Sequence, residues 1–413
     1  MHTDRNAALE LDRQDTLAHL RDSFVLREGL IYLDGNSLGP MQACVRERVH
    51  HCLDKEWGQD LIASWNSAGW FLLPQAIGGK IAPLIGAGTD DVVVTDSTSV
   101  NLFKVLASAI TLRPDRKVIV SERSNFPTDL YIAEGIAEFA ERGHTLRLID
   151  SVDELDEAIG DDVAVVMLTH VNYRSGAVHD MKKVTENVHA AGALMVWDLA
   201  HSAGALPVDL AAADADFAIG CGYKYLNGGP GAPAFVYVAP RLQKVAVQPL
   251  SGWYGHKAPF AFESSYDGAQ SIDRFLTGTP PILSLVALDA ALDIWNEVSL
   301  EDIRSKSKAL STLFIKLVEE RCGGFGLTLA SPRDADARGS QASFTHDNAF
   351  AIMQALIARD VIGDFRAPDI LRFGFTPLYV RFVDVFDAVE HLHDILQSGA
   401  WKQEKFNVRG TVT

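Results

Sequence analysis

The sequence has few cysteines and no long uncharged apolar stretch. Its cysteines, at positions 44, 52, 221 and 322, show neither the paired spacing of a disulfide framework nor a Cys-x-x-Cys motif, which predicts a reducing compartment, the cytoplasm. Every apolar run meets a charge well short of the roughly 20 residues of a membrane helix. Residues 1–6 lack the apolar core of a signal peptide. We therefore expect neither a membrane span nor a secretory leader.

Basic residues are the minority among the charged ones. The chain has 37 Lys and Arg against 54 Asp and Glu, a formal net charge of −17. Such a charge repels nucleic acid and anionic membranes, so neither is an expected partner. An anionic ligand must then be held by local dipoles, such as a helix N-terminus. A length of 413 residues with 47% hydrophobic content predicts two or three domains.

The middle of the chain alternates short β-branched runs with helical patterns, which predicts an α/β domain with a mainly parallel seven-stranded sheet and helices on both faces. The expected strands are residues 92–95, 117–120, 145–149, 163–169, 194–198, 216–220 and 234–238. The expected helices are 99–110, 128–141, 152–159 and 181–191.

After the paired prolines at 280 and 281 the pattern changes to a smaller α+β domain. Its expected elements are helices 283–298, 301–321 and 382–397, with strands near 343–345 and 370–374. We expect an N-terminal segment (1–60) that packs with the small domain, a large α/β domain (61–282) and the small domain (283–413).

Open α/β sheets bind ligands beyond the carboxyl ends of their strands, so the residues after each strand are the candidate site. Thr98 and Ser99 follow the first strand at a helix start, where hydroxyls and backbone N–H groups can hold a phosphate. An ordinary Ser/Thr helix cap is the alternative. Phe126 follows the second strand and is suited to stacking on a planar ring, or else to a hydrophobic staple.

Polar side chains also end the fourth and fifth strands. Thr169 lies at one strand end, and Asp198 ends the next, with His201 three residues later. A carboxylate there can keep a pyridinium nitrogen protonated, with the histidine as support. Capping of the next helix is the alternative for Asp198. A metal site is disfavoured because no third ligand has clear spacing.

Lys224 follows the sixth strand and leads into glycine-rich backbone, Tyr223-Lys-Tyr-Leu-Asn-Gly-Gly-Pro-Gly231. A lysine so placed can form a Schiff base with a carbonyl when burial keeps part of it uncharged. Taken alone, the Tyr-Lys pair favours a solvated turn lysine instead. Asp198 lies 26 residues earlier, enough for one strand–helix–strand excursion, so the two side chains are expected on neighbouring strands. Together the strand ends predict pyridoxal 5'-phosphate as the cofactor.

Five further motifs occur along the chain. Two of them are Leu33-Asp-Gly-Asn-Ser-Leu-Gly-Pro40 and Gly252-Trp-Tyr-Gly-His256. The others are Ser124-Asn-Phe-Pro-Thr-Asp129, His170-Val-Asn-Tyr-Arg-Ser-Gly176 and Arg372-Phe-Gly-Phe-Thr-Pro-Leu-Tyr379. In these motifs, and over nearly its whole length, the chain resembles the fold-type-I pyridoxal-phosphate enzymes, and among them the kynureninase family, for which the first two motifs are the more specific. The Asp-x-x-His-Ser-x-Gly block at 198–204 and the Tyr-Lys-Tyr block at 223–225 also fit class V aminotransferases and desulfurases, less closely.

The resemblance implies a role for each matching position. It implies phosphate contacts from Thr98, Ser99 and Tyr223, ring contacts from Phe126, Asp129, Thr169, Asp198 and His201, and a covalent anchor at Lys224. It implies that Trp253 and Thr279 reach the cofactor phosphate of a partner subunit, so that the enzyme is a homodimer with shared sites. Arg372 is expected to grip the substrate α-carboxylate, with Ser37 and Trp65 around the aryl group.

The implied reaction is hydrolysis of L-kynurenine to anthranilate and L-alanine in tryptophan catabolism, with Lys224 as base, Asp198 on the ring nitrogen and Tyr223 as proton relay. Thr279 and Trp65 resemble the bacterial form, which prefers kynurenine to 3-hydroxykynurenine.

Two other functions remain open at this point. A cysteine desulfurase or aminotransferase shares the fold, and Cys322 is the candidate nucleophile for a desulfurase. A non-catalytic sensor that binds an amino acid–cofactor adduct is the other, although no output domain is visible in the sequence.

Overall fold

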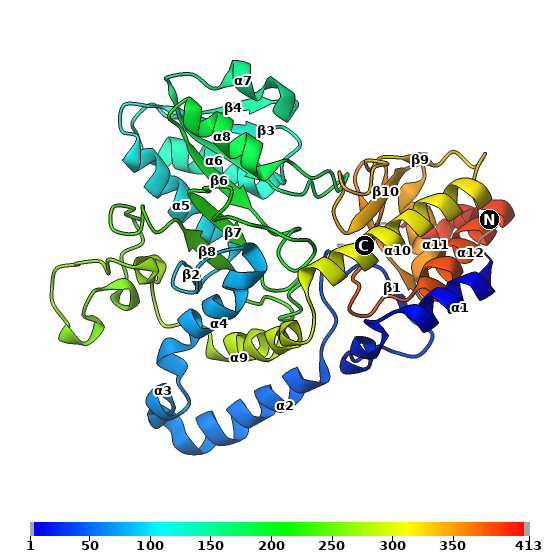
Figure 1. Cartoon of the computed structure of the whole chain (residues 1–413), viewed down its shortest axis with the longest axis horizontal. Helices are drawn as coiled ribbons and strands as arrows, with labels where there is room; N and C mark the ends of the chain where they lie inside the picture. The colour runs from blue at the N-terminus through cyan, green and yellow to red at the C-terminus, as the bar shows by residue number, and fades with distance from the viewer. Residues whose placement is uncertain (1–3, 409–413) are drawn as a thin grey trace.

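A seven-stranded sheet forms the centre of the chain in the computed structural model, which describes residues 4–408 (Figure 1). Its order is β2-β8-β7-β6-β5-β3-β4, and only β8 runs against the other strands. The predicted α/β fold with a mainly parallel sheet is confirmed, and each predicted strand is present within two residues at either end. The strands are β2 (Val92–Val94), β3 (Val118–Glu122), β4 (Thr145–Ile149), β5 (Val163–Thr169), β6 (Leu194–Asp198), β7 (Phe217–Gly220) and β8 (Phe235–Val238).

Helices cover both faces of this sheet. One face packs against α5 (Thr98–Leu112) and α6 (Pro127–Phe139). The other packs against α4 (Leu73–Ile81), α8 (Met181–Ala190) and α9 (Ile282–Ala291). All residues of β5 are buried, as expected for a parallel strand covered on both sides.

Some predicted helices differ from the observed ones. The segment predicted as helix 152–159 is a 3₁₀ turn followed by the short α7 (Leu155–Ala158). The helix predicted at 283–298 is α only to Ala291 and then tightens into a 3₁₀ helix. Between β6 and β7 the chain makes turns instead of the expected helix.

The C-terminal part has its own antiparallel sheet, in the order β12-β13-β10-β9. Its strands are β9 (Thr328–Leu329), β10 (Gln341–Thr345), β12 (Asp364–Arg366) and β13 (Ile370–Gly374), and its helices are α10 (Leu300–Arg321), α11 (Ala349–Ile357) and α12 (Phe382–Ser398). The N-terminal α1 (Arg5–Gln14) packs on α12, and β1 (Ile31–Tyr32) pairs with β11 (Val361–Ile362). Strands of two residues are too short to show alternation, so the sequence did not predict β1 and β11.

We propose the predicted three-part division of the chain, with two refinements from packing. Ala8, Leu17 and Leu20 belong to the C-terminal core, which supports an N-terminal segment attached to the small domain. However, α2 (Ala43–His51) packs on α9, and α9 packs into the core beneath the large sheet. The boundaries therefore fall better before α2 and after α9. The short α3 (Ser64–Ser67) links α2 to α4 (Figure 1). Residues 1–3 and 409–413 of the predicted domains lie outside the described residues.

A buried ion pair attaches the N-terminal segment to the small domain. Loss of this ion pair should destabilise the protein. Lys306 Nζ lies 2.7 Å from Asp15 Oδ2 and donates to the carbonyl of Pro377 at 2.6 Å. Replacing Lys306 with Met leaves the Asp15 carboxylate buried alone, which should cost about 3–5 kcal/mol in the free energy of unfolding. Urea unfolding followed by circular dichroism measures this.

The matched control is Lys308→Met on the same helix, because the partner of Lys308, Asp336, is exposed. The control should unfold near the wild-type midpoint. Equal losses in the two variants would contradict the stabilising role of the buried pair.

Candidate active site

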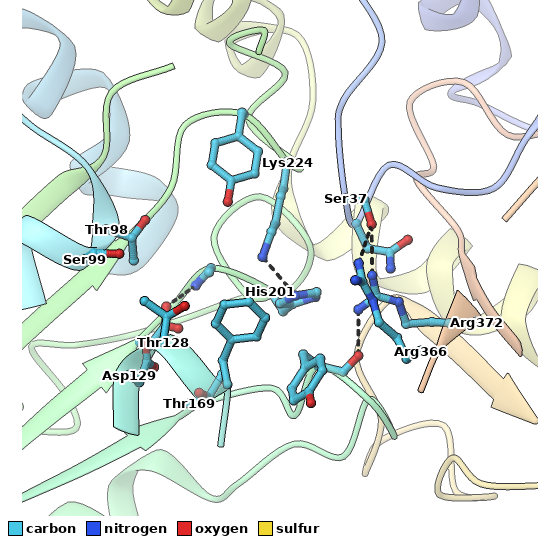
Figure 2. Close-up of a pocket in the computed structure, with 16 residues that line it drawn as sticks. Ser37, Thr98, Ser99, Thr128, Asp129, Thr169, His201, Lys224, Arg366 and Arg372 are labelled. Carbon is cyan, nitrogen blue, oxygen red and sulfur yellow. Dashed lines mark hydrogen bonds between the residues drawn. The ribbon is translucent and has the colours of Figure 1, made fainter. Parts of the chain in front are cut away.

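A cavity of about 330 Å³ lies where the carboxyl ends of the large sheet face the small domain. Figure 2 shows Thr98, Ser99 and Asp129 on one side of it, Arg366, Arg372 and Ser37 on the other, and Lys224 with His201 between them. The cavity brings together the predicted site residues Ser37, Thr98, Ser99, Phe126, Asp129, Thr169, Asp198, His201, Tyr223, Lys224 and Arg372. It also contains Asn36, Thr128, Tyr173, Ala200 and Arg366, which the sequence analysis did not single out.

The start of α5 supplies the hydroxyl-rich end of the cavity. Ser97 is the helix cap, and its hydroxyl accepts from the N–H of Val100 at 3.3 Å. Thr98 and Ser99 are therefore not used in capping, and they line the cavity in the first turn. This arrangement offers hydroxyls and the positive end of a helix dipole to a phosphate.

A buried lysine that sequence reasoning missed holds this turn in place. Lys104 is fully buried, forms an ion pair with Asp96, and donates to the carbonyl of Phe275 at 2.6 Å. Asp96 has a φ of 48° directly before the cap. The lysine thus ties the strained turn to the chain segment that precedes Thr279. Nothing in the spacing of Asp96 and Lys104 signals this contact.

Two carboxyl groups are buried against each other at the floor of the cavity. Asp198 ends β6 and accepts from the N–H of Ala200 at 2.7 Å, while Asp129 comes from the first turn of α6. Burial raises the pKa of both carboxyls, and the neighbouring Asp198 raises the pKa of Asp129 further through charge and a shared hydrogen bond. Asp129 Oδ2 has no hydrogen-bond partner among the described residues. The pair is therefore short of one positive, hydrogen-donating group.

Lys224 and His201 lie between this pair and the arginines. Lys224 Nζ is 3.0 Å from His201 Nε2. Burial, followed by the charge of Lys224, lowers the pKa of His201 well below its usual value, so the imidazole is neutral. A neutral imidazole can accept a hydrogen bond from the amine and does not repel it. Lys224 is thus a cavity residue and not a solvated turn lysine.

The N-terminal loop fixes the backbone around Lys224. The N–H of Gly39 donates to the carbonyl of Tyr223 at 2.8 Å. A Cβ at Gly39 would come within 2.5 Å of the Lys224 carbonyl, so only glycine allows this approach. The Leu33–Pro40 motif therefore holds the Lys224 backbone in place through Gly39, and it also contributes Ser37 to the lining of the cavity.

Phe126 and Thr169 form the wall beside the carboxyl pair. Asn125 Oδ1 accepts from the N–H of Phe126 at 2.7 Å and from the Thr169 hydroxyl. The ring of Phe126 is 40% exposed and packs edge-on against Tyr173, with 5.2 Å between centroids. Thr169 and Asp198 are register partners on β5 and β6. Phe126 also lines the cavity, so its exposed part can contact a planar ligand there.

The opposite end of the cavity contains paired charges, Arg366 and Arg372 with Asp364, and is called the arginine pole below. Arg372 on β13 lies across from Asp364 on β12, and its Nε donates to Asp364 Oδ1 at 2.8 Å. Its other nitrogens donate to Ser37 Oγ at 2.9 Å and to the carbonyl of Tyr173 at 2.7 Å. Arg366 lies two residues from Asp364 along β12, hence on the same face.

Three predicted site residues lie outside the cavity of their own chain. Trp65 packs edge-on against Trp70, with 5.9 Å between centroids. Trp253 is 38% exposed beside Tyr254, and Thr279 is exposed. The single chain does not bring them to the site.

Cys322 does not have the setting of a nucleophile. It caps α10, is buried, and has its pKa raised to about 12 by burial. No cysteine is among the described residues that line the cavity. Within residues 4–408, no three His, Cys, Asp or Glu side chains are grouped to hold a metal, and no helix is long and apolar enough to span a membrane.

A flat, phosphorylated aldehyde with a protonated ring nitrogen fits this donor set. It would meet hydroxyls at a helix start, an aromatic face, an unpartnered carboxyl pair and an amine. Fold and site are those of a fold-type-I pyridoxal-phosphate enzyme. The fold is shared with a cysteine desulfurase of Thermococcus onnurineus NA1, at TM-score 0.77 and 19% identity over 92% of this chain and 98% of that one. The cystine C–S lyase C-DES, with glycine linked to its PLP cofactor, matches at TM-score 0.79 and 18% identity over 91% and 99%.

Sequence comparison narrows the class. The family described as "Kynureninase C-terminal domain" matches residues 303–392. A kynureninase of Burkholderia mallei (strain SAVP1) is 56% identical over 99% of both chains. One from Pseudomonas fluorescens is 55% identical over the full length of both. The chain belongs to the kynureninase family.

The carboxyl pair predicts how stability depends on pH. Because the folded-state pKa of Asp129 is raised, the unfolded chain loses this proton at a lower pH than the folded chain does. Stability that comes from the neutral carboxyl is present at low pH and is lost as pH rises towards the raised pKa. In cofactor-free protein, the melting temperature of Asp129→Asn minus that of wild type should therefore increase as pH rises.

Differential scanning fluorimetry from about pH 5 to about pH 9 measures this difference. Saturation with pyridoxal phosphate should reverse its sign, because a protonated ring nitrogen stabilises the ionised pair of the wild type. A difference in melting temperature that is constant with pH would contradict the raised pKa of the Asp129 carboxyl in the folded chain.

Proposed function

We propose that the protein hydrolyses L-kynurenine to anthranilate and L-alanine with pyridoxal 5'-phosphate as its cofactor. Full-length identity of 55–56% to named kynureninases supports this activity. The observation that carries it in the molecule is the position of Lys224 in the cavity, between Asp129 on one side and Arg366 and Arg372 on the other (Figure 2). A cysteine desulfurase is not favoured, because the candidate Cys322 is buried and is not among the residues that line the cavity.

The side of the cavity formed by the large sheet would hold the cofactor. Thr98, Ser99 and Tyr223 would bind the phosphate, and Phe126 would cover a ring face beside Thr169. Asp198, with Asp129 behind it, would accept a hydrogen bond from the ring nitrogen and keep it protonated. Lys224 would be the covalent anchor, within reach of His201.

When bound, the cofactor withdraws electrons from the amino acid, which makes the Cα proton acidic and allows the Cβ–Cγ bond to break. Lys224 Nζ removes the Cα proton, and His201 Nε2, neutral and 3.0 Å away, holds the amine in place. The Tyr223 hydroxyl relays a proton in the later steps. Water adds to the aryl ketone, and its oxygen leaves in the carboxylate of anthranilate.

Arginines orient the substrate so that this proton faces Lys224. The arginine pole lies across the cavity from Thr98 and Ser99 (Figure 2). A substrate with its carboxylate at the arginines and its amine at the cofactor therefore spans the space beside Lys224.

A homodimer completes the site in this proposal. Trp253 belongs to an exposed aromatic group with Phe260 and Phe262, which are 64% and 81% exposed. Exposed aromatic groups of this kind are typical of protein interfaces. In a dimer, Trp253 and Thr279 would reach the partner's phosphate, and Trp65 would reach its aryl pocket. The bacterial pattern at Thr279 and Trp65 favours kynurenine over 3-hydroxykynurenine.

We propose the cytoplasm as the location. All four cysteines are free thiols, and three are buried, which suits a reducing compartment.

Turnover of kynurenine by the purified protein with added pyridoxal phosphate tests the activity. Anthranilate fluorescence should rise with L-kynurenine and more slowly with 3-hydroxykynurenine. Lys224→Ala should lose the visible absorbance of the lysine-bound cofactor and at least the roughly 10²–10⁴-fold rate that a positioned base contributes.

Lys182→Ala, at an exposed lysine of α8 that pairs with Glu186, is the control and should retain the wild-type rate. Binding spectra without anthranilate would favour the sensor, and sulfide release from cysteine would favour a desulfurase. Either result would contradict the proposed reaction.

Subunit mixing tests the shared sites. Lys224→Ala and Trp253→Ala are each expected to be weakly active alone. A mixed dimer has one site with both defects and one with neither, so unfolding and refolding the two variants together should restore activity. No gain over the separate variants, or a monomer by ultracentrifugation, would contradict a site shared between subunits.

A further inference from the structure

Gln341 is a fully buried amide on β10, and part of its hydrogen-bonding capacity is unused. It is not among the residues that line the cavity. Its Nε2 donates to the carbonyl of Tyr173 at 3.1 Å. Because a carbonyl can only accept, this contact fixes the orientation of the amide, and Oε1 faces the other way. Oε1 is buried and has no hydrogen-bond partner among the described residues.

Backbone contacts between the two parts of the chain hold Gln341 in this place. The N–H of Gly339 donates to the carbonyl of Gly176 at 2.7 Å, and the N–H of Val178 donates to the carbonyl of Ala337 at 3.0 Å. Gly176 has a φ of 74°, and a Cβ there would come within 2.7 Å of Gln341 Cγ. Only glycine therefore allows the loop after β5 to close on the Gln341 side chain.

His201 has the complementary unused atom. Its Nε2 lies 3.0 Å from Lys224 Nζ, whereas its Nδ1 is buried without a hydrogen-bond partner among the described residues. Burial, and then the charge of Lys224, lower the pKa of His201, while the Gln341 side chain raises it as a hydrogen-bonding neighbour. Gln341 is thus close enough to act on the imidazole, although Nδ1 and Oε1 do not meet in full hydrogen-bond geometry. A proton on Nδ1 would satisfy both buried atoms at once.

The position of that proton decides what His201 presents to Lys224. A neutral imidazole carries one proton, on Nδ1 or on Nε2. A proton on Nδ1 leaves the lone pair of Nε2 facing the lysine. A proton on Nε2 leaves Gln341 Oε1 without a donor and directs an N–H group at the amine. That N–H would engage the amine lone pair, which Lys224 needs in order to act as a base.

We propose that Gln341 is a positioning residue that sets the tautomer of His201, with the proton on Nδ1 and the lone pair of Nε2 facing Lys224. This inference rests on the proposed function, in which Lys224 removes the Cα proton. It adds to that function a residue from outside the cavity. His201 follows a strand of the large sheet and Gln341 lies on the small sheet, so the tautomer depends on contact between the two parts of the chain.

The first test reads the tautomer directly. Holoenzyme labelled with ¹⁵N in its histidines is examined by NMR, and the signals of His201 are assigned by their loss in His201→Asn. Wild type should have a protonated Nδ1 and an unprotonated Nε2. Gln341→Met keeps the length of the side chain without its polar atoms, and it should move the proton to Nε2 or produce a mixture of tautomers. A wild-type His201 protonated on Nε2, or the wild-type tautomer retained in Gln341→Met, would overturn the proposal.

The second test measures the consequence for Lys224. Exchange of the Cα proton of L-alanine in D₂O, followed by ¹H NMR, requires removal of that proton but no carbon–carbon cleavage. Gln341→Met should lower the exchange rate at saturating L-alanine by about 10- to 100-fold. The dissociation constant of L-alanine and the visible absorbance of the bound cofactor should stay near their wild-type values. Gln341→Glu should recover part of the rate, because a carboxyl group keeps an acceptor oxygen for Nδ1.

A merely structural role for Gln341 would give a different pattern. Gln341→Met would then weaken L-alanine binding and reduce the cofactor content along with the exchange rate, and Gln341→Glu would give no recovery. Either this pattern or an unchanged exchange rate would overturn the proposal. If Gln341→Met fails to fold by circular dichroism, Gln341→Glu supplies the comparison with wild type, and the wild-type tautomer still decides the question.

The matched control is Gln243→Met. Gln243 is half-buried, and its Nε2 donates to Asp91 Oδ1 at 2.8 Å, directly before β2 and so at the sheet edge opposite the cavity. The control should change neither the tautomer nor the exchange rate, and an equal loss of rate would contradict a specific role of Gln341. Absence of anthranilate from a wild type that exchanges the Cα proton normally would count against the proposed function and not against this inference.

Discussion

The buried Asp129–Asp198 pair is the constraint on which the site depends. Two carboxyls at the end of a parallel sheet, one with an oxygen that lacks a partner among the described residues, are unfavourable unless a positive donor meets them. The register of β5, β6 and β7 places Thr169, Asp198 and Ile219 side by side, so the pair faces the loop that carries Lys224. A protonated pyridine nitrogen would supply the missing donor, and the same interaction would make the cofactor a stronger electron acceptor.

The cavity has two charged ends that belong to different parts of the chain. The carboxyl pair and the hydroxyls come from the large sheet, and the arginines come from the small antiparallel sheet. The N-terminal loop joins them, because Gly39 bonds to the backbone beside Lys224 while Ser37 bonds to Asp364. This connection gives a physical reason for the Leu33–Pro40 motif. In the proposed reaction, the substrate would be held at the arginine end and would react at the cofactor end.

The large sheet and most of the candidate site could be predicted from the sequence, since the strands of the large sheet are short, apolar and bounded by polar turns. Loops that follow parallel strands lie at the same edge of the sheet. The sequence alone could therefore group Thr98, Phe126, Asp198 and Lys224. Arg366 could have been found in the same way, because an Asp-Phe-Arg run on a strand puts both charges on one face.

Other features depend on tertiary contacts that leave no local pattern. Lys104 reaches Asp96 and Phe275 only because α5 packs beside both segments. The apolar residues of α9 do not by themselves indicate which domain the helix joins, and the structure places Leu285, Val286 and Leu288 in the core beneath the large sheet. Trp65, Trp253 and Thr279 lie away from the cavity of their own chain, so one chain cannot show the role that the family resemblance implies for them.

The most direct test of the central interaction is the protonation state of the cofactor ring. Protein loaded with pyridoxal phosphate labelled with ¹⁵N in the ring can be examined by NMR from about pH 6 to about pH 9. The carboxyl pair predicts a protonated nitrogen throughout this range in the resting enzyme. An unprotonated nitrogen, or one that titrates within the range as a solvated pyridine does, would contradict the role assigned to Asp198 and Asp129.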